Sequence, residues 1–127
     1  MDYFARLNEI ADLKGGWFDG ESEAYTKEEI DYAKDFLADL ASAGQVDFYI
    51  YPSVHFRGIR LEKYLDIANK KIDVSVDLNT KEHSAYYRYL DLDTNEEKEA
   101  SVYTAHELAS YMNLHTFLAK YSERKLT

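Results

Sequence analysis

The chain has no cysteine, a single proline and five glycines among its 127 residues. Without cysteine it can form neither disulfides nor thiolate zinc sites, and it has no cysteine nucleophile. Few prolines and glycines, with 46% hydrophobic residues, distinguish it from disordered chains. No apolar run approaches the roughly 20 residues that cross a bilayer, and residues 1–10 do not resemble a secretory signal. We therefore expect one folded domain, residues 1–127, that is cytoplasmic and does not bind membranes.

The charge is strongly negative and unevenly distributed along the chain. The sequence has 24 acidic and 15 basic residues, a formal net charge of -9. Residues 1–44 hold 11 of these acids and 4 of these bases, which gives this segment a charge of -7. A surface of this kind repels phosphate and anionic lipid and attracts basic partners. The alternative interpretation is that the acids only keep the protein soluble.

Two helices are predicted in the N-terminal third. Apolar residues at helical spacing predict the first over residues 2–13. Thr26 followed by Glu29 fits a capping box, and the apolar residues repeat every three or four positions from there to Gly44. The second helix is therefore predicted to start after Thr26 and to end near Gly44.

After Gly44 the apolar period changes to two, which is typical of strands with one buried face. Strands are predicted over residues 46–52, 55–62, 72–78 and 84–93. Residues 63–71 remain ambiguous, and residues 93–101 are predicted to be a charged loop. Four strands with short connections indicate an antiparallel meander.

Thr104 and Glu107 form a second capping-box pattern, and a closing helix is predicted from there to about Arg124. The expected fold is α+β: two N-terminal helices, a four-stranded antiparallel meander sheet, and a C-terminal helix packed on one sheet face.

Three short motifs resemble small bacterial proteins of unassigned function. They are a W-x-x-G loop before a helix, a strand ending in proline, and a Gly-Gly-Ile strand closing on Glu-Trp. The corresponding segments here are Trp17-Phe18-Asp19-Gly20-Glu21, Tyr49-Ile50-Tyr51-Pro52 and Gly58-Ile59-Arg60-Leu61-Glu62. The likeness covers about residues 7–62. This chain departs from the pattern at Arg57, in place of a glycine, and at Lys63, in place of a tryptophan. The resemblance implies a shared fold and no particular activity.

In composition the chain is similar to phage-encoded inhibitors of bacterial defence, the anti-CRISPR proteins, and to immunity proteins that neutralise nucleases. All are small, acidic and rich in tyrosine. This likeness implies an inhibitor that acts by binding a protein.

One face of the second predicted helix carries an acidic stripe. Its carboxylates fall at positions i, i+3, i+7 and i+11, with a tyrosine beside them, at Glu28, Asp31, Tyr32, Asp35 and Asp39. Such a line could imitate a nucleic-acid backbone and occupy a basic groove in a nuclease or a CRISPR effector. A solvated helix face is the alternative.

The loop before this helix holds the only tryptophan. Trp17, Asp19 and Glu21 would adjoin the stripe, with Trp17 either filling space between helices and sheet or anchoring a partner.

Tyrosine is abundant, at 12 residues. On one predicted strand Tyr87 and Tyr89 share a face, and Tyr86, Arg88 and Leu90 share the other. Either some of these phenols pack beneath the helices or one face is a recognition surface.

No catalytic or metal-binding motif emerges. The segment 91–102 starts like an EF-hand loop but has Glu96 where glycine belongs and Val102 where the last glutamate belongs. The four histidines lack metal-ligand spacing. We expect no cofactor, no metal and no enzymatic activity.

The favoured function is that of an acidic inhibitor that binds a protein with a basic, nucleic-acid-handling surface and makes no direct contact with nucleic acid. The first alternative is a housekeeping or toxin–antitoxin-associated bacterial domain, whose acids only keep it soluble and have no target. The second is a DNA-binding regulator, because the sequence of residues 103–126 resembles a helix-turn-helix.

Overall fold

The fold is a five-stranded antiparallel sheet with three helices, seen in a computed structural model that describes residues 3–15, 24–53 and 58–121. Two helices precede the sheet and one follows it. The elements are α1 (Tyr3–Ala11), α2 (Lys27–Ser42), β1 (Tyr49–Pro52), β2 (Ile59–Ile67), β3 (Lys70–Asn79), β4 (Ser84–Asp91), β5 (Glu97–Val102) and α3 (Ala105–Tyr121). The predicted α+β class and meander are therefore confirmed.

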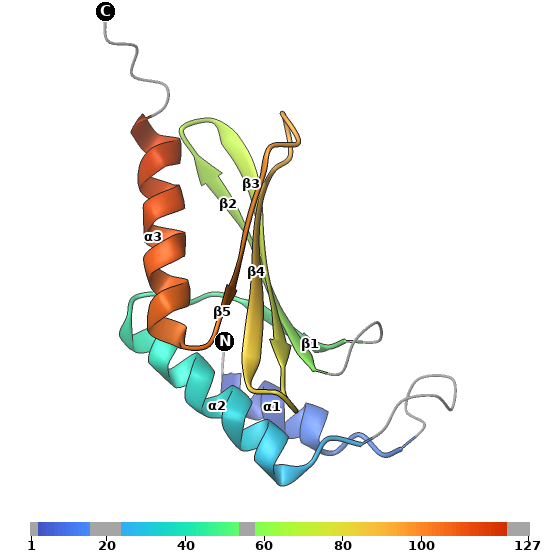
Figure 1. Cartoon of the computed structure of the whole chain (residues 1–127). Coiled ribbons are helices and arrows are strands. Elements are labelled where there is room, and N and C mark those ends of the chain that lie inside the picture. Colours follow the sequence, from blue (N-terminus) through green and yellow to red (C-terminus); the bar gives the residue numbers. More distant parts are fainter. Residues whose placement is uncertain (1–2, 16–23, 54–57, 122–127) are drawn as a thin grey trace, which may run out of the picture.

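The sheet is a simple meander in which the strand order is β1-β2-β3-β4-β5. α3 stands beside one face of it, and α1 and α2 lie across its lower end in Figure 1. β3 shows the reason for this layering, because Ile72, Val74, Val76 and Leu78 are buried on the helix side while the residues between them face the other way. None of the helices among the described residues has the length and apolar character needed to cross a membrane.

The prediction of four strands is wrong, because the segment assigned to a charged loop contains β5. Residues 97–102 pair with β4 from Leu90↔Glu97 to Ala85↔Val102. Its charged residues did not indicate a strand, because an edge strand with one open face needs few apolar side chains.

The ambiguous segment 63–71 is also strand, apart from its turn. β2 continues to Ile67, and Ala68 and Asn69 both have positive φ, 51° and 66°, in the two-residue connection to β3. Such turns usually carry glycine. This connection has no glycine, so the sequence did not clearly predict a turn between β2 and β3.

α3 is one continuous helix from Ala105 to Tyr121. A helix-turn-helix needs a turn between its two helices, and none interrupts this described range. Thr104 caps the helix as predicted, since its hydroxyl oxygen accepts the Glu107 N–H at 3.1 Å.

The start of α2 is held by a buried polar contact. The capping box is complete: Thr26 Oγ1 accepts the Glu29 N–H at 3.2 Å, and Glu29 Oε1 accepts the Thr26 N–H at 3.1 Å. The second carboxylate oxygen of Glu29 accepts the Thr80 hydroxyl at 2.5 Å. Both Glu29 and Thr80 are buried, so this bond fixes α2 against the turn between β3 and β4.

Replacing Thr80 with valine should therefore destabilise the protein. The Thr80→Val variant leaves one oxygen of a buried carboxylate without its hydroxyl donor, which should lower the free energy of unfolding by about 1–3 kcal/mol. Urea denaturation measures this change. Thr116→Val, at a partly exposed site on α3, is the control and should shift the midpoint little. Equal stability of the two variants would contradict a structural role for the Glu29–Thr80 bond.

Candidate functional site

The acidic stripe of α2 lines a hollow on the protein surface. The helix buries Ile30, Ala33, Leu37 and Leu40 against the core, which turns the stripe outward. The hollow has an empty volume of about 680 Å³, part of it open to solvent. Its lining residues are Glu28, Asp31, Tyr32, Asp35, Phe36, Asp39, His83 and Tyr103. We call this the acidic groove.

All five stripe residues predicted from the sequence line this groove, and His83 and Tyr103 were missed. His83 comes from the turn between β3 and β4, and Tyr103 lies between β5 and α3. No local sequence signal relates either residue to α2, because only the register of the sheet brings them there.

Aromatic rings form part of the groove wall. The Tyr32 and His83 rings stack with centroids 4.4 Å apart and an interplanar angle of 6°. Burial raises the pKa of Tyr32 to about 12, so the phenol stays protonated at neutral pH. Its buried hydroxyl has no hydrogen-bond partner in the described part of the chain. The groove thus offers aromatic surface beside its carboxylates.

The groove keeps most of its negative charge. Lys27 Nζ lies 3.0 Å from Asp31 Oδ2, but the Lys27 side chain is almost fully exposed. Ion pairs of this kind have a small interaction energy in water, so the pair hardly reduces the attraction of Asp31 for another cation. Glu28 Oε1 lies 3.8 Å from His83 Nε2, a pair that is charged only when the imidazole is protonated. Among the described residues, Asp35 and Asp39 have no lysine or arginine within ion-pair distance.

The predicted loop residues Trp17, Asp19 and Glu21 lie outside the described residues. Their place beside the stripe stays a prediction.

A second polar surface lies on the sheet face away from the helices, where opposite charges meet. The Arg60 guanidinium lies 3.6 Å from Glu62 and 3.5 Å from Asp77. The Arg88 Nε donates to Glu97 Oε1 at 2.7 Å. Burial raises the pKa of Asp77, against the opposing effect of Arg60. These groups compensate one another, unlike the carboxylates of the acidic groove.

The tyrosines of β4 lie on opposite faces of the sheet, as the sequence predicted. Tyr87 and Tyr89 are buried beneath α3, which confirms the packing alternative for this face. Tyr86 is partly exposed on the open face, where its hydroxyl donates to Glu99.

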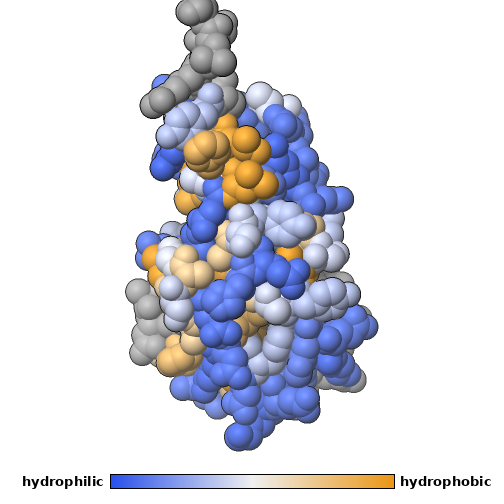
Figure 2. Space-filling model, turned by 60° about the vertical axis from the view of Figure 1, so that its left-hand side comes forward, coloured by the Kyte–Doolittle hydropathy of each residue, from blue (hydrophilic) through white to orange (hydrophobic). Residues whose placement is uncertain are grey.

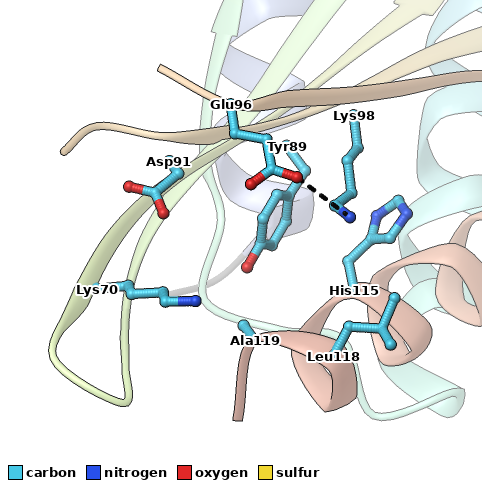
Figure 3. Close-up of a pocket in the computed structure, with 8 residues that line it drawn as sticks. All are labelled: Lys70, Tyr89, Asp91, Glu96, Lys98, His115, Leu118 and Ala119. Carbon is cyan, nitrogen blue, oxygen red and sulfur yellow. Dashed lines mark ion pairs between the residues drawn. The ribbon is translucent and has the colours of Figure 1, made fainter. Parts of the chain in front are cut away.

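A smaller hollow, with an empty volume of about 420 Å³, lies between β4, β5 and the C-terminal half of α3 (Figure 3). Lys98 Nζ lies 3.7 Å from Glu96 Oε1 at its edge. His115 Nδ1 and the Tyr87 hydroxyl are 2.8 Å apart behind it. Burial, helped by the charge of Lys98, lowers the pKa of His115, so this imidazole is neutral at pH 7. The hollow is small and of mixed charge, and we do not regard it as the main site.

Neither hollow has the ligand set of a metal centre. Within the described ranges, no group of three His, Asp or Glu side chains could hold a metal ion. What the acidic groove offers a binding partner is negative charge and aromatic surface.

Comparison with known proteins gives no relative: no protein-family model, no curated protein and no solved structure matches the chain.

The neutral state of His115 makes the stability of the protein depend on pH. The unfolded imidazole, with its ordinary pKa near 6.5, binds a proton before the folded one does. Stability from His115 is thus present above pH 6.5 and is lost as the pH falls toward the lower folded pKa. Urea unfolding of the wild type and of His115→Gln should show a difference in free energy that narrows between pH 7.5 and about pH 5.5. A constant difference across this range would show that His115 is not held neutral.

Proposed function

We propose that the protein acts by binding, and that its acidic groove receives Lys and Arg side chains from a protein with a basic surface. The observation that carries this proposal is the convergence of four α2 carboxylates on one hollow where only Asp31 is paired with a lysine, among the described residues.

The groove suits cationic side chains for two physical reasons. Its carboxylates run from Glu28 to Asp39, about 16 Å along the helix at 1.5 Å per residue, so several cations can be bound at once. The exposed ring of Tyr103 and the stacked pair of Tyr32 and His83 add faces for cation–π contacts, which guanidinium groups favour.

The partner class follows from charge. A basic surface that binds nucleic acid is arranged to meet regularly spaced anions. A helix with carboxylates every three or four residues presents a comparable line, so occupying such a surface would exclude the nucleic acid. We therefore propose an inhibitor of a nucleic-acid-handling protein, such as a nuclease or a CRISPR effector. The alternative, a domain whose acids only maintain solubility, gives no role to the exposed ring of Tyr103 at the groove.

A charge-reversed variant tests the groove directly. We expect Asp31→Lys with Asp35→Lys to weaken binding of a fluorescently labelled hexa-arginine peptide by at least about tenfold, because both attraction and groove shape are lost. Fluorescence anisotropy at 50 mM salt measures the affinity. Circular dichroism checks that the variant is folded.

The matched control is Asp66→Lys with Asp93→Lys, two exposed acids outside the groove that change the net charge equally. It should retain most of the affinity. Equal losses in both double variants would mean that net charge alone attracts the peptide, and the groove would then not be a site. The association rate of the peptide should also fall as the salt concentration rises to about 500 mM, because salt shortens the distance over which the charges attract each other.

A further inference from the structure

The smaller hollow contains a buried hydroxyl that the fold does not use. Tyr89 is only 5% exposed, and its ring extends from β4 into the space between the sheet and α3 (Figure 3). Its hydroxyl oxygen is shielded from solvent and has no hydrogen-bond partner in the described part of the chain. A buried hydroxyl without a partner costs free energy, so we expect it to bond to a molecule that occupies the hollow.

Two lysines flank this hydroxyl on the neighbouring strands. Lys98 is the cross-strand partner of Tyr89 on β5, and Lys70 begins β3, on the other side of β4. Both side chains line the hollow, and Figure 3 shows the Tyr89 ring between them. Ammonium groups and a phenol are hydrogen-bond donors at neutral pH, and donors gathered in this way suit an anionic oxygen.

The two acids of the hollow already have partners within the chain. Asp91 Oδ1 accepts the backbone N–H groups of Asp93 and Thr94 at 2.9 and 3.2 Å, and these bonds hold the pKa of Asp91 below its ordinary value. Glu96 is paired with Lys98. Both carboxylates still repel other anions, so a ligand with one negative charge fits the hollow better than a dianion.

The side of the hollow formed by α3 is apolar. Leu118 and Ala119 line it, and Leu118 is 43% exposed at its rim. Figure 2, in which the α3 side of the molecule comes forward, shows hydrophobic side chains gathered near the C-terminal end of that helix. An aliphatic chain that contacts these side chains leaves water, which favours binding. The size of the hollow limits this chain to a few carbons.

We propose that the smaller hollow binds a short-chain aliphatic carboxylate. The carboxylate lies between Lys70 and Lys98 and accepts the Tyr89 hydroxyl, and the aliphatic tail lies against Leu118. Among the described residues none lines both hollows, so this site and the acidic groove can succeed or fail independently. The ligand would connect β4 and β5 to α3 and thereby stabilise the folded protein.

Titration with sodium butyrate at constant ionic strength tests the site. A ligand of this size is expected to bind with a Kd on the order of 1 mM. NMR signals of Tyr89 and His115 should shift as butyrate is added, whereas those of His83, in the acidic groove, should stay unchanged. Absence of saturable shifts up to about 50 mM butyrate would overturn the proposal and leave the hollow to water.

Tyr89→Phe separates a ligand-binding role from a structural one. The variant removes a hydroxyl that has no partner in the described chain, so without butyrate its urea midpoint should not fall. Its affinity for butyrate should fall about tenfold, because a hydrogen bond to a charged group is lost. Tyr111→Phe, which lies on α3 outside the hollow, is the control and should bind normally. Lower stability of Tyr89→Phe with unchanged affinity would show that the hydroxyl is structural.

Two adjacent lysines test the contact with the anion. Lys70 lines the hollow, whereas Lys71 lies on the other face of β3 because side chains alternate along a strand. Lys70→Gln should weaken butyrate binding several-fold, and Lys71→Gln, which removes the same charge, should not. Equal losses in both variants would mean that butyrate responds to net charge and has no site in the hollow.

Two further ligands test the chemical class. Butylamine has a similar aliphatic tail on a cation and should not bind, and inorganic phosphate should bind more weakly than butyrate because Asp91 and Glu96 repel a dianion. Equal affinities for butylamine and butyrate would show that only the tail is recognised. Tighter binding of phosphate would contradict a site for monocarboxylates.

Discussion

The buried carboxylate of Glu29 positions the surface that we regard as functional. One of its oxygens completes the capping box at the start of α2, and the other accepts the Thr80 hydroxyl from the turn between β3 and β4. The same turn carries His83, whose ring stacks on Tyr32. Tying the helix to this turn therefore sets the orientation of the stripe and assembles the groove. A buried polar group is costly to bury unless it is hydrogen-bonded, which explains why both oxygens of Glu29 have partners.

The two polar surfaces of the domain differ in how far their charges are paired. On the open sheet face, Arg60 and Arg88 lie among Glu62, Asp77 and Glu97, and the groups neutralise one another across strands. On α2 the acids follow one another along a helix that has few bases, and among the described residues only Asp31 is paired with one of them. The excess of acids in the composition is thus concentrated where a partner could meet it.

Local patterns in the sequence predicted the helices, the central strands and the five stripe residues well. The capping box at Thr26 and the alternation along residues 72–78 depend only on neighbours in the chain. β5 was missed because Glu97, Lys98 and Glu99 suit an edge strand only once β4 is present to pair with them. The contributions of His83 and Tyr103 to the groove were missed for the same reason, since they depend on the register of distant strands.

The meander also determines the order in which the chain can assemble. Every strand pairs with its neighbour along the chain, so each hairpin closes a short loop at a small entropic cost. The packing of α2 against α3 is different, because it encloses the entire sheet segment, residues 43–104. Topology of this kind favours early formation of the sheet and late docking of its two flanking helices.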